Sequence, residues 1–286
     1  FFQAEPGIRD CLLSRGLGDV YKRQGLNSCN ILDENVKISI LHTNDVHSQI
    51  EPFPSNHNIY PDRGGFAKRA NIFNGLMKLN PNTLIFDAGD IFQGTPYFNF
   101  FQGELELNLM KKMGYNAATI GNHEFDAGLD ILKRNIINND FQFISSNYDF
   151  TNTALEGLVS RYKVFKKQNI KIGVFGLGIE LNGLVNSSLY KETKYYDPIE
   201  ITNEMTYKLK TEEKCDLIIC ISHLGHTYSD DKISDLKLGS LTSDIDLIIG
   251  GHTHTLLKKP EIIKNSKNKD CLLYTSPSPR DKRQSR

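Results

Sequence analysis

Short runs of apolar residues recur along the chain and alternate with segments of helical periodicity. The apolar runs predict buried strands at residues 37–43, 83–89, 117–122, 142–147, 170–178, 215–223 and 245–254. The periodic segments predict helices near residues 65–78, 103–113, 126–138, 199–213 and 231–238. Strands that alternate with helices indicate an α/β domain in which the helices cover the sheet.

One stretch departs from this alternation. Residues 160–178 contain two apolar runs joined by a short polar segment, which is typical of a β-hairpin. A hairpin brings an antiparallel pair into a sheet whose other strands are joined through helices. We therefore expect mixed β-sheet.

The two ends of the chain contain peptides that complementary DNA strands can encode. Residues 14–24 and 271–280 can be encoded by the two complementary strands of one DNA segment, which is not expected of two unrelated peptides. Both stretches resemble translated sequencing-library adapters. We therefore interpret residues 1–24 and 271–286 as non-native sequence that contributes nothing to the fold.

The remaining sequence is expected to form a leader segment over residues 25–36 and one domain over residues 37–270, truncated at its C-terminal end. The whole chain is neutral, with 34 Lys and Arg against 34 Asp and Glu. Within residues 25–270 there are 26 basic and 30 acidic residues, a net charge of about −4, which argues against a surface that binds nucleic acid polymers. No apolar run reaches the roughly 18 residues that a membrane span requires.

Polar residues gather where five of the predicted strands end. The segments are HTNDVH (42–47), DAGD (87–90), GNHEFD (121–126), SHLGH (222–226) and GGHTH (250–254). In open α/β sheets ligands bind outside the carboxyl ends of the strands, so five such ends at one edge bring these side chains into a single site.

The side chains in these segments are typical metal ligands. The candidate donors are Asp45, His47, Asp90, Asn122, His223, His252 and His254. Imidazole, carboxylate and amide donors together suit zinc, manganese or iron. Seven donors exceed the needs of one tetrahedral zinc ion but fit two ions that share a bridging carboxylate. Such a pair, ~3.5–4 Å apart, generates hydroxide at neutral pH and binds both oxygens of an in-line displacement.

The spacing of the residues supports a metal site, although each motif taken alone has a simpler structural explanation. Asp45 and His47 are two positions apart, as are His252 and His254, and extended backbone places both members of such a pair on the same side. Taken singly, Asn122 could cap a helix, and GHTH could be a surface turn. The five motifs together, each at a strand end, favour a metal site.

The same five segments resemble the signature blocks of the calcineurin-like metallophosphoesterases. More narrowly, they are similar to the catalytic domain of the bacterial 5′-nucleotidase family over residues 37–255. The resemblance implies an α/β metallophosphoesterase fold with mixed β-sheets in α/β/β/α layers and helices on the outer faces. It also implies two divalent metal ions as cofactors, with manganese, zinc and iron as candidates.

The resemblance also implies a role for each residue that matches a family motif. One metal ion would be held by Asp45, His47 and His254, and the other by Asn122, His223 and His252, with Asp90 as the bridge. His123 would be the catalytic histidine and Asp126 its carboxylate partner. Several family members have Gln or Asn at the position of His254, which is a departure that bears on metal preference. Glu124 is expected to be structural or solvated, and His226 to lie outside the ligand set.

Function follows as an expectation from these roles. A metal-bound hydroxide would attack phosphorus, and His123 would stabilise charge on the leaving group or donate a proton to it. The expected enzyme is a 5′-nucleotidase-like hydrolase in nucleotide catabolism that cleaves nucleoside 5′-monophosphates or similar small phosphoesters. The alternatives are a phosphodiesterase acting on cyclic nucleotides or nucleotide sugars, and a non-catalytic metal-binding scaffold.

Two further expectations concern location and partners. Residues 26–29, LNSC, resemble the end of a bacterial lipoprotein signal, in which Cys29 would carry a lipid anchor. The nucleotidase branch of the family is exported, so an extracytoplasmic enzyme, periplasmic or lipid-anchored, is expected. In two-domain nucleotidases a separate C-terminal domain largely holds the base, and such a domain is an expected partner.

Overall fold

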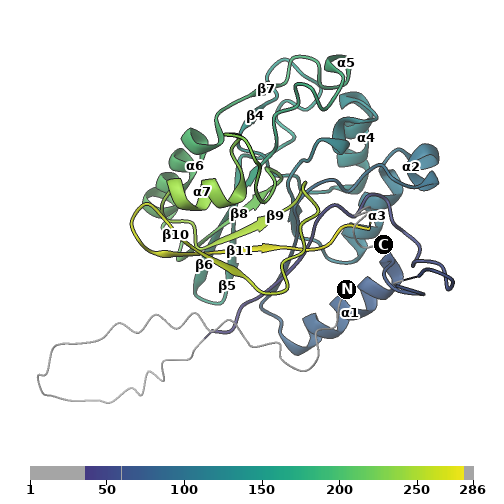
Figure 1. Ribbon diagram of the computed structural model, residues 1–286, viewed down its shortest axis with the longest axis horizontal. Coiled ribbons are helices and arrows are strands. Elements are labelled where there is room, and N and C mark those ends of the chain that lie inside the picture. Colours follow the sequence, from purple (N-terminus) through teal and green to yellow (C-terminus); the bar gives the residue numbers. More distant parts are fainter. Residues whose placement is uncertain (1–35, 59, 280–286) are drawn as a thin grey trace, which may run out of the picture.

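The computed structural model describes residues 36–58 and 60–279, which form the body shown in Figure 1. The expected non-native segment 1–24 and nearly all of the leader, with Cys29, lie outside the described residues. None of the helices in the described ranges combines the length and the apolar character that crossing a membrane requires.

The first of two central sheets is parallel and short. Its order is β1-β2-β3, with β1 at Ser39–Thr43, β2 at Thr83–Asp87 and β3 at Ala117–Ala118. Every residue of β2 is buried, as its apolar sequence predicts. This strand alternates between two environments, because Leu84 and Phe86 face the second sheet whereas Ile85 faces helices.

The second sheet is mixed, as predicted, and has the order β10-β11-β9-β8-β6-β5. Its bounds are β5 Tyr162–Lys167, β6 Ile170–Leu177, β8 Leu217–Ser222, β9 Leu247–Gly250, β10 Glu261–Lys264 and β11 Asp270–Thr275. Strands β6, β8, β9 and β11 are parallel, whereas β5 and β6 form the predicted hairpin and β10 pairs antiparallel with β11. A small two-stranded sheet joins β4 (Tyr148–Asp149) to β7 (Lys194–Tyr195).

Helices cover the outer faces of both sheets (Figure 1). The first sheet is covered by α1 Phe66–Leu79, α2 Pro96–Phe101, α3 Glu104–Lys112 and α4 Leu129–Asn139. The second is covered by α6 Pro198–Tyr207 and α7 Asp235–Leu241. The remaining turns are the 3₁₀ helix η1 His123–Phe125, α5 Ser187–Tyr190 and the π-helical turn η2 Lys208–Glu212.

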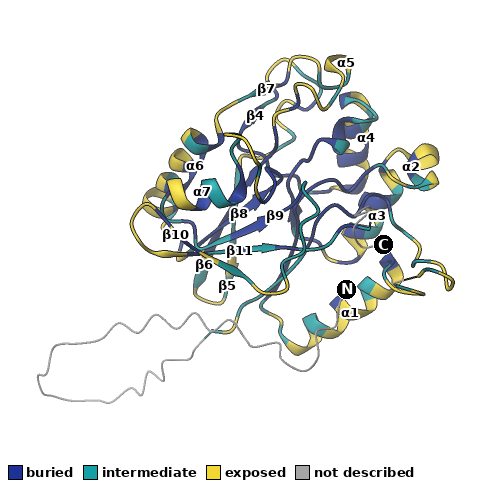
Figure 2. Ribbon diagram, viewed as in Figure 1, coloured by how far each residue is buried: buried dark blue, intermediate teal, exposed yellow. Residues whose placement is uncertain are grey.

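Three apolar clusters account for this layering. One lies under α1, α3 and α4, a second lies under α6 and α7, and a third lies between the sheets. The third cluster includes Phe86 from β2, Val174 from β6 and Ile221 from β8. Buried residues accordingly fill the centre of the molecule in Figure 2, and exposed ones occupy the outer helices. The predicted α/β/β/α arrangement is confirmed.

Strand β11 corrects the expectation that residues 271–286 contribute nothing to the fold. Asp270–Thr275 pairs parallel with β9 and antiparallel with β10. Its side chains alternate, with Cys271, Leu273 and Thr275 buried. This apolar period of two suits one packed face of a sheet, whatever the origin of the sequence. The prediction that this sequence is non-native concerns its coding origin and stays a prediction.

The segment at residues 142–147 also differs from the prediction of a strand. It makes only isolated bridges, between Ala118 and Phe143 and between Ile144 and Ser160. Its backbone instead connects both central sheets, since the Ser146 N–H donates to the Gly176 carbonyl of β6. An apolar run therefore identified a buried segment correctly, but not its hydrogen-bonding partners.

A buried acid at the end of β2 ties the first sheet together. The Asp87 carboxylate accepts hydrogen bonds from Thr43 Oγ1 at 2.5 Å and from the Gly89 N–H at 2.9 Å. Thr43 Oγ1 also lies 2.7 Å from the Tyr115 hydroxyl. Burial raises the pKa of Asp87 from 3.8 to about 8, and the hydrogen bond from Thr43 only partly offsets this.

The raised pKa of Asp87 gives stability a pH dependence. As pH rises above 3.8 the unfolded chain loses this proton first, so the stability that protonated Asp87 contributes is complete below that value and lost towards about pH 8. The loss is at most about 1.4 kcal/mol per pH unit. We expect the urea midpoint of the metal-free protein to fall with pH more steeply in the wild type than in Asp87→Asn. Parallel profiles for the two proteins would contradict this.

Candidate metal centre

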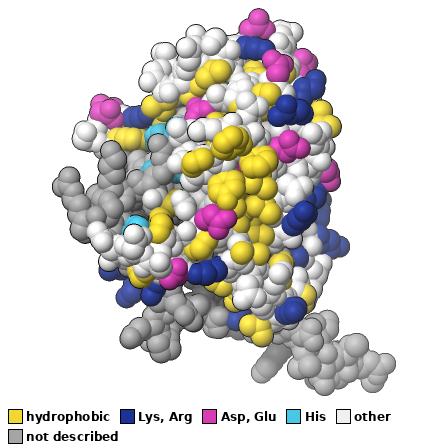
Figure 3. All heavy atoms as spheres, turned by 90° about the vertical axis from the view of Figure 1, so that its right-hand side faces the viewer, with side chains coloured by type: hydrophobic (Ala, Val, Ile, Leu, Met, Phe, Trp, Pro, Cys, Tyr) yellow, Lys and Arg dark blue, Asp and Glu magenta, His cyan; other side chains and the backbone are white. Residues whose placement is uncertain are grey.

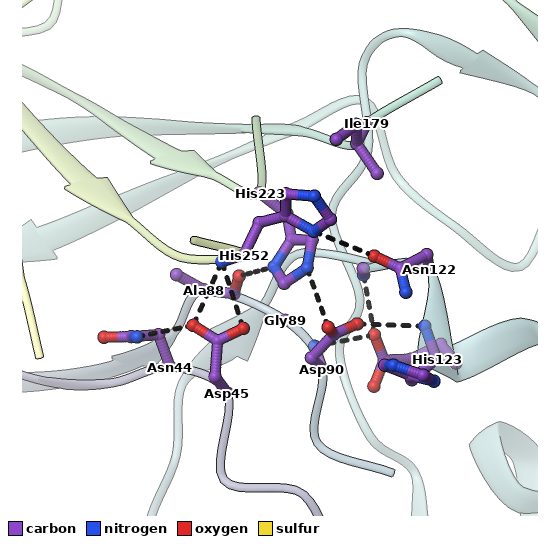
Figure 4. A network of polar contacts seen from close by, with 12 residues as sticks. Asn44, Asp45, Ala88, Gly89, Asp90, Asn122, His123, Ile179, His223 and His252 are labelled. Carbon is purple, nitrogen blue, oxygen red and sulfur yellow. Dashed lines mark hydrogen bonds and ion pairs between the residues drawn. The ribbon is translucent and has the colours of Figure 1, made fainter. Parts of the chain in front are cut away.

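All seven predicted donors lie together where the carboxyl ends of the two central sheets meet. Asp45 and His47 follow β1, Asp90 follows β2, and Asn122 follows the short strand β3. The second sheet contributes His223 after β8, and His252 and His254 after β9. Figure 4 shows Asp45 and Asp90 pointing towards His223 and His252. On the face shown in Figure 3, small patches of histidine side chain are visible at the surface.

The backbone of these loops is strained. Five of the seven donors have φ in the left-handed region: Asp45 (50°), His47 (47°), Asp90 (56°), His252 (71°) and His254 (53°). Non-glycine residues rarely adopt this conformation, and it persists where surrounding contacts over-determine it. Hydrogen bonds between the loops supply those contacts, because the Asp45 and His47 N–H groups donate to the carbonyls of Gly89 and Asp90.

The first group of donors is the set that the family resemblance assigned to one metal ion. Ligand atoms of Asp45, His47 and His254 all lie within 4.8 Å of one another. His254 Nε2 is 3.1 Å from His47 Nε2 and 3.5 Å from Asp45 Oδ1. The Asp45 carboxylate also accepts a hydrogen bond from the backbone N–H of His252, which lies 3.0 Å from each carboxylate oxygen. This contact joins the first group of donors to the second.

The second group centres on Asp90, whose ligand atoms cluster in the same way with His223 and His252. His223 Nε2 lies 3.1 Å from Asp90 Oδ2, and the Asn122 amide oxygen lies 3.0 Å from His252 Nδ1. Asp90 also forms a cluster of this kind with His47 and His123. Its carboxylate therefore stands between the two groups, where a bridging ligand would stand.

Backbone carbonyls fix the orientation of two imidazoles. His47 Nδ1 is 3.0 Å from the Gln93 carbonyl oxygen, and His223 Nδ1 is 2.6 Å from that of Ala88. A carbonyl only accepts, so each Nδ1 carries the proton and each Nε2 faces the other donors. Metal-binding histidines are held in this way.

The buried charged groups in the site shift one another's pKa values. Burial raises the pKa of Asp45 to about 7, although the charge of His223 opposes this effect. For Asp90 the effect of burial is outweighed by His223, His47 and His123, and its pKa lies well below the usual range. Burial lowers the pKa of His223, but Asp90 outweighs burial and raises the pKa to about 10. The buried carboxylates thus require positive charge beside them, as a cation site does.

His123 and Asp126 form the pair that the resemblance implied. His123 Nδ1 lies 2.7 Å from Asp126 Oδ2, and about a quarter of each side chain is exposed. Burial lowers the pKa of His123, but the hydrogen bond that the ring donates to Asp126 and the nearby charge of Asp90 outweigh burial and raise the pKa. The His123 N–H also donates to Asp90 Oδ1 at 2.9 Å, which places the pair beside the central carboxylate.

Glu124 is fully buried and structural, which settles the open alternative against a solvated side chain. Its carboxylate accepts four backbone N–H groups, those of Gly121 (2.6 Å), Ile91 (2.7 Å), Asp90 (2.9 Å) and Phe92 (3.3 Å). It therefore ties the turn that carries Asp90 to the turn that carries Asn122. The sequence offered one signal for this role, which is that Glu124 stands three positions after Gly121 in a tight turn. The second turn that Glu124 contacts, at Asp90, is distant in sequence and could not be inferred.

A comparison with protein families identifies this arrangement. The model of the calcineurin-like phosphoesterases matches residues 38–256, more than half of the chain, and spans all five motifs. The chain belongs to this family. Calcineurin-like phosphoesterases are metal-dependent hydrolases, and the imidazole, carboxylate and amide donors gathered here suit divalent ions of that kind.

Individual relatives in the family agree with this assignment. The chain is 32% identical to a 5′-nucleotidase of Vibrio vulnificus, over 82% of this chain and 43% of the relative. It is 31% identical to the trifunctional nucleotide phosphoesterase YfkN of Bacillus subtilis, over 80% of this chain and 16% of that protein. The crystal structure of a 5′-nucleotidase precursor from Thermus thermophilus superposes with a TM-score of 0.77 and 30% identity, covering 84% of this chain and 49% of the other. The chain thus spans less than half the length of these relatives.

The role of Glu124 can be tested by replacing its carboxylate with an amide. Glu124→Gln places an N–H donor group among four N–H donors, so at least one loses its acceptor at a cost of about 1–3 kcal/mol. We expect a lower free energy of unfolding and weaker Mn²⁺ binding, measured by urea titration and calorimetry. Glu106→Gln, which alters an equally buried carboxyl on α3 outside these turns, is the control and should retain Mn²⁺ binding. Unchanged Mn²⁺ affinity in Glu124→Gln would contradict the assigned role.

Proposed function

We propose that this chain is the catalytic domain of a 5′-nucleotidase-like hydrolase that uses two divalent metal ions and acts on nucleoside 5′-monophosphates or similar small phosphoesters. The observation that carries the proposal is the position of Asp90 between two groups of donors, with the His123–Asp126 pair beside it. The relatives add support, since they are named for action on nucleotides.

Asp45, His47 and His254 would hold one ion and Asn122, His223 and His252 the other, with Asp90 shared. When bound, the ions supply Lewis acidity, which activates water for attack on phosphorus and neutralises phosphoryl charge. Asp126 accepts a hydrogen bond from His123 Nδ1–H, so the protonated ring would direct Nε2–H towards the site. A proton held there stabilises the leaving oxygen or is transferred to it as the ester bond breaks.

A phosphodiesterase activity is the second candidate. It is supported by the similarity to the trifunctional phosphoesterase and by 32% identity to a NAD 5′-nucleotidase of Haemophilus influenzae over 79% of this chain. The non-catalytic scaffold gains no support from the site, because the proposed catalytic pair His123 and Asp126 lies beside the clustered candidate donors.

A substrate panel separates these candidates. We expect the protein with Mn²⁺ to release phosphate from AMP faster than it cleaves cyclic AMP or a nucleotide sugar. A chain extended with the C-terminal domain proposed as its partner is the comparison, since that domain would complete the base pocket. Preferred cleavage of cyclic AMP or of the nucleotide sugar would identify a diesterase, and no cleavage of any of the three by either protein would refute the proposal.

Variants separate metal binding from chemistry. His123→Ala should keep both ions and lose roughly 10²–10⁴-fold in kcat, the usual effect of losing a general acid. Asp90→Ala should lose at least one ion as well as activity, and Asp126→Ala should resemble a milder His123→Ala. Metal content per chain and turnover of AMP are the measurements. If His123→Ala sheds metal while Asp90→Ala keeps two ions, the roles are wrong.

An extracytoplasmic location is part of the proposal. Relatives in the comparisons include a 5′-nucleotidase precursor and snake venom 5′-nucleotidases, names that support an exported enzyme. A periplasmic or lipid-anchored protein, with Cys29 as the point of lipid attachment, requires a hydrophobic stretch upstream of Leu26. The upstream gene sequence tests for that stretch directly.

A further inference from the structure

A second buried acid lies behind the metal site and takes no part in the chemistry described so far. Asp235 is the first residue of α7, and its side chain is fully buried. Ser222 Oγ donates to Asp235 Oδ1 at 2.5 Å, while Oδ2 has no hydrogen-bond partner among the described residues. Burying a carboxyl with one oxygen left without a hydrogen bond costs free energy, so we looked for what its contacts provide in return.

One side of Asp235 supports the turn that carries His223. Ser222 precedes His223, and its Oγ, which donates to Asp235, also accepts the Leu224 N–H at 3.2 Å. The Asp235 N–H donates in turn to the Gly225 carbonyl at 2.8 Å. Asp235 therefore contacts this turn on both sides of the histidine, through its side chain and its backbone.

The other side of Asp235 supports the loop that carries His252. A Cβ placed on Gly250 would lie 2.3 Å from Asp235 Oδ2, so the carboxyl packs directly against this backbone. Gly250 ends β9 and begins the GGHTH segment. One carboxyl thus contacts two loops that belong to different strands and contribute different donors.

The ionisation state of Asp235 agrees with a packing role. Burial raises its pKa to about 8, although the hydrogen bond from Ser222 and the charge of His223 lower it. A mostly neutral carboxyl at neutral pH adds little charge beside the imidazoles. Asparagine is consequently a close substitute, because it is neutral, has the same shape and still accepts from Ser222.

We propose that Asp235 is a positioning residue that sets His223, through Ser222, and the GGHTH loop, through Gly250, for the metal ion proposed to bind Asn122, His223 and His252. This inference rests on the proposed function. It implies an unequal effect, because His223 and His252, two of the three donors proposed for this ion, lie on turns that Asp235 contacts, whereas His254 alone among the other ion's own donors does.

Mn²⁺ titration by calorimetry and EPR, on the full chain, tests the selectivity. We expect the wild type to bind two ions and Asp235→Ala to lose affinity for one of them by roughly 10–100-fold, the usual effect of removing an outer-sphere partner. The other ion should be weakened less, because among its own donors only His254 lies on a loop that Asp235 contacts. His223→Ala and His254→Ala provide reference titrations that identify which ion is weakened. Asp235→Asn should restore most of the lost affinity.

Two further variants distinguish positioning from general destabilisation. Ser222→Ala keeps the buried carboxyl and removes the hydroxyl that joins it to the turn, together with the acceptor of the Leu224 N–H, so it tests the inference even if Asp235→Ala fails to fold. Asp246→Asn is the matched control, since Asp246 Oδ2 accepts the Ile218 N–H at the opposite edge of the same sheet. It should lower stability without changing Mn²⁺ affinity.

The outcomes separate the two proposals. Two ions in the wild type, with unchanged affinities in both Asp235→Ala and Ser222→Ala, would overturn the positioning role alone. Equal weakening of both ions, matched by Asp246→Asn, would overturn it as well. A wild type that binds fewer than two ions would overturn the proposed function and the inference together.

Discussion

The site depends on four hydrogen bonds that the Glu124 carboxylate accepts from backbone N–H groups. They join the turns after β2 and β3, which no strand pairing holds at that point. Gly121 lies in one of these turns, and a Cβ there would lie 2.4 Å from Asp90 Oδ1. The two turns therefore approach so closely that only glycine fits, and Asp90 keeps its left-handed conformation as a result.

The layered fold explains how buried charge is tolerated at this point. Three apolar clusters fix the two sheets against each other and against their helices, so the carboxyl ends of the strands meet in a constant arrangement. Asp45, Asp90 and Glu124 are all buried there. Their charge is met by imidazoles and backbone N–H groups, and in the proposed enzyme by metal ions.

Much of the fold and the residues that gather at the candidate site could be predicted from the sequence, because apolar runs mark strands and the polar segments follow them directly. The reason given for the spacing of Asp45 and His47 was nevertheless wrong. It assumed extended backbone, whereas both residues are left-handed, as are His252 and His254. Their side chains converge because the loops turn tightly, and backbone dihedrals of that kind depend on hydrogen bonds between distant segments.

The features that sequence could not reveal are likewise long-range. The carbonyls that orient His47 and His223 belong to Gln93 and Ala88, and any residue type offers a carbonyl. Strand β11 was not predicted, because residues 271–286 were excluded as adapter-derived sequence although the side chains of the strand alternate between buried and less buried. The contact of Asp235 with Gly250 exists only after β9 and α7 have packed together.

The central claim is that Asp90 joins two metal ions in one centre. EPR spectroscopy of the protein with two equivalents of Mn²⁺ tests it most directly, because ions ~3.5–4 Å apart that share a carboxylate are magnetically coupled. We expect a multiline spectrum of a coupled pair, with two Mn²⁺ per chain. The spectrum of isolated Mn²⁺, or a single bound ion at saturation, would contradict the claim.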